Sequence, residues 1–93
     1  MATVVVKIDR DEILKLITKN WPDKRAVFMA LGTRTWELMD KPRRRSAEWI
    51  WPAILLKHFG WGLQNSARTP EDCVVHFREV IEYLEKPRYV SSE

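Results

Sequence analysis

The chain has 93 residues, 45% of them hydrophobic and 31% charged, with a formal net charge of +3. This length and balance predict one domain around one core and exclude a disordered chain. Its single cysteine, Cys73, excludes an intramolecular disulfide and is typical of a reducing compartment. The longest apolar run, Trp49 to Leu56, is too short to span a bilayer, and the N-terminus lacks a signal-peptide pattern. We therefore expect a cytoplasmic protein without membrane contact.

The charges are unevenly distributed along the chain. Residues 1–40 are nearly balanced, with seven Lys or Arg and six Asp or Glu. Residues 41–68 carry six basic residues and one acidic residue, whereas residues 69–93 carry three and six. An anionic partner is therefore expected to bind the middle segment.

The patterns predict a mainly α fold over residues 1–93, a small helical bundle of four to five helices with a short N-terminal β-strand. The β-branched run in Thr3–Ile8 predicts a strand or arm over residues 1–8. A lone strand is unstable and needs a partner. Two partners are open: Arg88–Val90 of the same chain, or Val4–Val6 of a second copy in a homodimer.

Residues 9–59 read as helical. Asp9 is placed as the N-cap of a first helix, with Glu12 at capping-box spacing and with Ile8 and Ile13 at the positions of a hydrophobic staple. Pro22 ends this helix.

Two further helices are predicted around Gly32. The first covers residues 23–31 and ends at Gly32, which has the position of a C-terminal cap. The second covers residues 34–39 and is capped by Thr33, and Pro42 ends it.

Pro52 is interpreted as the first residue of a helix over residues 52–59, closed by Gly60 and Gly62, with a polar connector over residues 63–68.

The C-terminal helix, over residues 69–86, has the clearest boundary signals. Thr69 caps it, Pro70 occupies its first position, and acidic residues follow in the first turn.

No catalytic or metal-binding constellation is recognisable. His58 and His76 lie on different predicted helices, and Cys73, three residues before His76, lacks the further ligands that a metal site needs. Cys73 falls on an apolar stripe beside acidic residues, which favours a core thiol over a nucleophile. We expect no enzyme activity, no cofactor and no bound metal.

The segment Val27–Trp36 reads as a helix, a glycine turn and a second helix. With the following basic residues and Leu-rich helix, residues 23–59 resemble the helix-turn-helix of small Cro/repressor-type DNA-binding regulators. The resemblance implies that Arg34 and Thr35 face base edges of double-stranded DNA. It also implies that four cations contact phosphates: Lys41, Arg43, Arg44 and Arg45. The alternative for these cations is a solvated loop.

Three tryptophans flank this basic segment: Trp49, Trp51 and Trp61. Exposed tryptophan beside arginine is typical of a protein-binding hot spot, and also of a stacking platform for single-stranded nucleic acid or RNA. Alternatively, all five tryptophans of the chain fill the core.

The leading hypothesis is therefore a small non-enzymatic DNA-binding protein, a possible transcriptional regulator. The alternative is a protein–protein interaction module, such as a phage-type inhibitor that docks on an acidic surface of a host protein through exposed Trp and Arg side chains.

Overall fold

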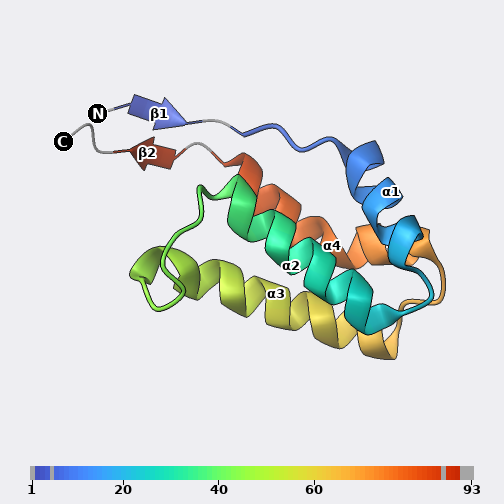
Figure 1. The fold of residues 1–93 in the computed structure, drawn as a ribbon. Helices are drawn as coiled ribbons and strands as arrows, with labels where there is room; N and C mark the ends of the chain where they lie inside the picture. The colour runs from blue at the N-terminus through green and yellow to red at the C-terminus, as the bar shows by residue number, and fades with distance from the viewer. Residues whose placement is uncertain (1, 5, 87, 91–93) are drawn as a thin grey trace.

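The computed structural model describes residues 2–4, 6–86 and 88–90, and this part of the chain contains four α-helices. Their bounds are α1 (Arg10–Asn20), α2 (Lys24–Leu38), α3 (Ala47–Asn65) and α4 (Pro70–Glu85). In Figure 1, α3 runs along the lower edge of the bundle, and α1 lies at the opposite side. Both helices pack against α2 and α4. The predicted mainly α bundle is confirmed, but the described residues form no fifth helix.

A short antiparallel ribbon joins the two ends of the chain. Strand β1 (Ala2–Val4) pairs with β2 (Arg88–Val90), with Thr3 opposite Tyr89. The predicted strand extended to Ile8, but residues 6–9 have no strand pairing, and Val5 lies outside the described residues. The partner of β1 is thus the tail of the same chain, so this strand does not need the homodimer contact through Val4–Val6.

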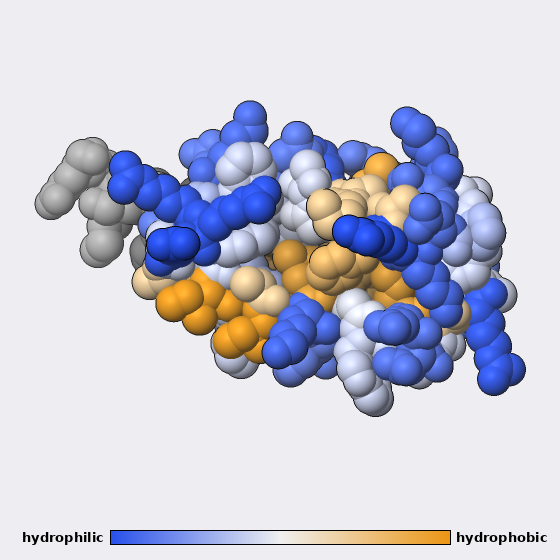
Figure 2. Space-filling model, turned by 60° about the horizontal axis from the view of Figure 1, so that its bottom comes forward, coloured by the Kyte–Doolittle hydropathy of each residue, from blue (hydrophilic) through white to orange (hydrophobic). Residues whose placement is uncertain are grey.

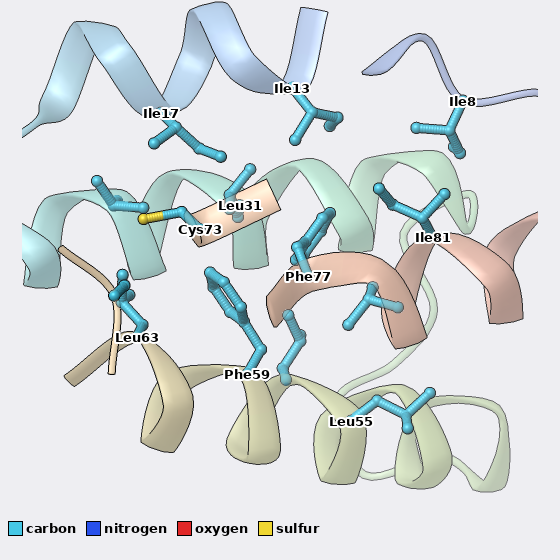
Figure 3. Packing of buried hydrophobic residues seen from close by; sticks show 14 of the residues in the cluster. Ile8, Ile13, Ile17, Leu31, Leu55, Phe59, Leu63, Cys73, Phe77 and Ile81 are labelled. Atoms are coloured by element: carbon cyan, nitrogen blue, oxygen red, sulfur yellow. The ribbon is translucent and has the colours of Figure 1, made fainter. Parts of the chain in front are cut away.

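The four helices share one hydrophobic core. Figure 3 shows Ile17 of α1, Leu31 of α2, Phe59 of α3 and Phe77 of α4 pointing into the same interior. The rings of Phe59 and Phe77 meet edge to face, with their centroids 5.0 Å apart. Each fully buried side chain of this size stabilises the fold by about 1.5–3 kcal/mol.

The predicted caps of the first and last helices are confirmed. The Asp9 carboxylate accepts hydrogen bonds from the backbone N–H groups of Asp11 and Glu12. At α4, the Thr69 hydroxyl accepts the N–H of Asp72, and the Asp72 carboxylate accepts the N–H of Thr69, each at 3.2 Å. This reciprocal capping box fixes the start of α4 where the sequence placed it.

The predicted turn at Gly32 is wrong, because α2 continues through it without a break. Gly32 does not have a positive φ. The buried positions of α2 follow helical spacing across the glycine: Val27, Leu31 and Thr35. Burying this continuous stripe offsets the penalty of about 1 kcal/mol for a glycine in a helix. The helix-turn-helix that the resemblance implied is therefore not formed at residues 23–39.

The helix predicted over residues 52–59 is longer in the structure. Because α3 begins at Ala47, Pro52 is inside the helix rather than at its first position. The proline removes one backbone donor from the helix, but its ring is buried in the core, which offsets part of that cost.

Gly60 and Gly62 also lie inside α3, not at its end. A Cβ on Gly60 would lie 2.8 Å from Cε2 of Phe28, and a Cβ on Gly62 would lie 2.7 Å from Nδ1 of His76. The two glycines therefore allow side chains of α2 and α4 to approach the α3 backbone. Residues 63–65, predicted as part of a connector, continue the helix.

Candidate interaction surface

Helix α3 carries several large apolar side chains that are exposed to solvent. Ile50 is 57% exposed, Trp51 53%, Ile54 37% and Trp61 71%. At helical spacing these four residues share the side of α3 that points away from its buried residues. We call them the outer face of α3. Figure 2 brings this side of the molecule forward and shows apolar side chains exposed among charged ones.

The inner side of α3 already has its packing partners. Leu55, Phe59 and Leu63 are buried in the core, and α3 packs on α2 and α4. Within the described parts of the chain, no other element packs against this helix. A helix that is apolar on both sides is normally buried on both sides, so the outer face of α3 has the composition of a surface that another molecule covers.

The three tryptophans that the sequence suggests as interface residues therefore lie in two different environments. Trp49 is half-buried against the core, whereas Trp51 and Trp61 are exposed. The interpretation in which all tryptophans fill the core is wrong for these two. Trp61 also borders a shallow groove between α3 and α4, together with His58 and Val75.

The loop between α2 and α3 holds the predicted cations in a defined conformation. We call residues 41–45 the basic loop. Trp36 Nε1 donates a hydrogen bond of 2.7 Å to the carbonyl oxygen of Pro42. The guanidinium of Arg44 lies over the Trp36 ring, 5.8 Å from its centroid. The Ser46 hydroxyl donates to the carbonyl of Arg43 at 2.6 Å.

All four cations of the basic loop are exposed. Among the side chains that the structure describes, no carboxylate lies within 4.0 Å of their charged nitrogens. The loop directly precedes α3, so its positive charge lies at the N-terminal end of the outer face of α3.

Arg34 and Thr35 do not join the basic loop. The Arg34 guanidinium is 3.1 Å from the Glu12 carboxylate on α1 and 4.0 Å from the Glu37 carboxylate. Thr35 is buried, and its hydroxyl donates to the carbonyl of Leu31 at 2.8 Å. Thr35 is therefore inaccessible to a base edge, which overturns its predicted role. Arg34 is partly neutralised at the α1–α2 contact.

Cys73 is a buried core residue, as predicted. Burial is the main cause that raises the pKa of its thiol, and the neighbouring Asp72 and Glu71 carboxylates raise that pKa further. A thiol in this environment is a poor nucleophile. In the part of the chain that the structure describes, no three His, Cys, Asp or Glu side chains converge at metal-binding distances.

No helix of the described chain has both the length and the apolar character needed to cross a bilayer. No protein-family model, curated protein sequence or solved structure matches this chain.

Sequence reasoning missed Ile50 and Ile54, two of the four residues of the outer face of α3. The prediction of a helix that begins at Pro52 places Ile50 outside any helix. The signal that would have found them is the helical spacing of residues 50, 54 and 61, continued through Pro52.

Proposed function

We propose that this chain is a protein–protein interaction module and that the outer face of α3 is its contact surface. One observation carries the proposal: Ile50, Trp51, Ile54 and Trp61 are exposed on one side of a single helix whose other side is fully packed. Interface hot spots are enriched in tryptophan and arginine and lie around an apolar centre. The outer face of α3 supplies the tryptophans and the apolar centre, and the arginines lie next to it in the basic loop.

The size of the surface also supports a contact role. The two exposed indoles contribute roughly 300 Å² of accessible area, from the area of a tryptophan side chain and the two exposed fractions. Ile50, Ile54 and the neighbouring Val75 bring the exposed apolar area to the order of 500 Å². Patches of this size are the largest that ordinary monomers expose, and they are often functional.

Nucleic-acid binding through the basic loop is a second candidate. It is favoured by four exposed cations without a carboxylate partner in the described chain, held in place by Trp36. Backbone phosphates attract such a cluster. We rank it second because α2 continues through Gly32, so the predicted recognition helix is absent.

One experiment distinguishes the two functions. The immobilised chain is incubated with extract of its source cell and washed at about 1 M salt, where exposed charges are screened within about 3 Å. If the chain is an interaction module, we expect it to capture a protein that stays bound through this wash. We expect the Ile54→Lys variant not to capture that protein.

Met29→Lys is the matched control, because Met29 is 59% exposed on α2, away from α3. Capture that is equal for both variants would contradict the proposal. In parallel, the chain is titrated with random duplex DNA at two salt concentrations. Tight DNA binding that weakens steeply with salt and requires Arg43, Arg44 and Arg45 would favour the second candidate.

A further inference from the structure

We infer that the outer face of α3 binds a second copy of this chain, with the two α3 helices packed antiparallel across a two-fold axis. The inference rests on the proposed function and commits its surface to one occupant. Three observations carry it: the exposed area, the arrangement of side chains along α3, and the position of the basic loop.

The exposed area fits a small symmetric interface. A two-fold contact uses the same patch twice, so an exposed apolar area on the order of 500 Å² per chain gives on the order of 1,000 Å² in total. The polar side chains that lie between Ile54 and Trp61 on the same side of α3, Lys57 and His58, are exposed as well. With their area included, the contact reaches the lower end of standard interfaces, about 1,200 Å².

The side chains on α3 are arranged for pairing with themselves. Ile50 and Trp61 lie near the two ends of the stripe, and Ile54 lies between them. With the axis near residues 54–58, Ile50 of each copy meets Trp61 of the other, and Ile54 of each copy meets the aliphatic stem of Lys57 of the other, whose ammonium group stays in solvent at the edge of the contact. Exposed small or polar residues extend the same side of the helix at its ends: Ala47 and Asn65.

The basic loop selects the antiparallel orientation. In a parallel pair, two loops with four cations each would lie side by side, which costs free energy at an interface. In an antiparallel pair, the loops lie at opposite ends of a 19-residue helix, about 28 Å apart. That separation exceeds the screening length of about 8 Å at physiological salt, so the repulsion between the loops is small.

The solution mass of the full chain tests the inference. The monomer mass is 11.1 kDa. Between about 1 μM and about 1 mM, the range of weak to moderate association, we expect light scattering to show a rise towards twice this mass. The rise should persist at high salt, because the contact is apolar.

Ile50→Lys should abolish the mass increase, and Met29→Lys should leave it intact. The two residues are 57% and 59% exposed, so each exchange adds one charge at a similarly accessible helix position. Circular dichroism checks that both variants fold, and Ile54→Lys repeats the test at a second position of the outer face of α3. A monomer at every concentration, or equal effects of Ile50→Lys and Met29→Lys, would overturn the inference.

Disulfide trapping tests the orientation. An equimolar mixture of Ala47→Cys and Asn65→Cys chains should cross-link on mild oxidation, whereas each variant alone should cross-link slowly. Faster cross-linking of each variant with itself would indicate parallel helices and refute the antiparallel arrangement. A monomeric chain that still loses its captured protein on Ile54→Lys would overturn self-association alone and leave the proposed function standing.

Discussion

Replacing Gly32 with alanine tests whether α2 is one continuous helix. Alanine is favoured over glycine in a helix interior by about 1 kcal/mol. The added methyl group would have no heavy atom of a neighbouring element within 4 Å at this position. We therefore expect Gly32→Ala to raise the free energy of unfolding by about 0.5–1 kcal/mol. For a domain of this size, the melting temperature should rise by roughly 2–8 °C.

Urea unfolding followed by far-ultraviolet circular dichroism measures this change. Gly62→Ala is the matched control, because its methyl group would lie 2.7 Å from Nδ1 and 3.1 Å from Cγ of His76. Overpacking of this kind costs about 1–3 kcal/mol, and the helix preference for alanine offsets about 1 kcal/mol of it, so we expect Gly62→Ala to lower the free energy of unfolding by up to about 2 kcal/mol. A helix-ending glycine with positive φ would reverse the sign at Gly32. Loss of stability in Gly32→Ala would therefore refute the continuous helix.

Three further changes test other parts of the fold. Thr69→Ala removes the cap of α4 and should lower the free energy of unfolding by about 1 kcal/mol; an unchanged urea midpoint would contradict this. The backbone N–H of Ile8 is the main cause that lowers the pKa of Glu85 below its ordinary value of 4.5. The stabilisation by Glu85 is present above that value and is lost as pH falls through the lowered pKa, so Glu85→Gln should flatten the acid side of the stability–pH curve. Trp36→Phe removes the donor to the Pro42 carbonyl and should speed trypsin cleavage in the basic loop. Unchanged cleavage would show that Trp36 does not hold the basic loop in its conformation.

The ends of the bundle were predictable because local chemistry determines them. Asp9 and Thr69 satisfy the first free N–H groups of α1 and α4 from within their own segments. No tertiary contact is needed for these caps, so their positions can be read from the sequence alone. The buried stripe of α4 follows from the same local periodicity.

The middle of the chain was predicted poorly because tertiary packing overrides local signals there. Gly32, Pro52, Gly60 and Gly62 are all typical of helix ends, yet all lie inside helices. Gly60 and Gly62 are required by side chains from other helices, which sequence alone does not bring together. Pro52 is retained by its burial in the core.

The candidate surface was predicted in part for the same reason. The basic loop and three candidate tryptophans, Trp49, Trp51 and Trp61, follow from the sequence, but their exposure does not, because the sequence left open that all tryptophans fill the core. To predict that Ile50 and Ile54 share one exposed side, the true length of α3 must be known. To predict that Thr35 is buried, α2 must be known to be continuous.

Hydroxyl-radical footprinting of the chain, when dilute, when concentrated and with duplex DNA, tests the central claim most directly. We predict that Trp61 and Ile54 lose reactivity in the concentrated sample, while half-buried Trp49 and exposed Met29 stay unchanged. Protection that occurs only with DNA, and only at the basic loop, would contradict self-association through the outer face of α3.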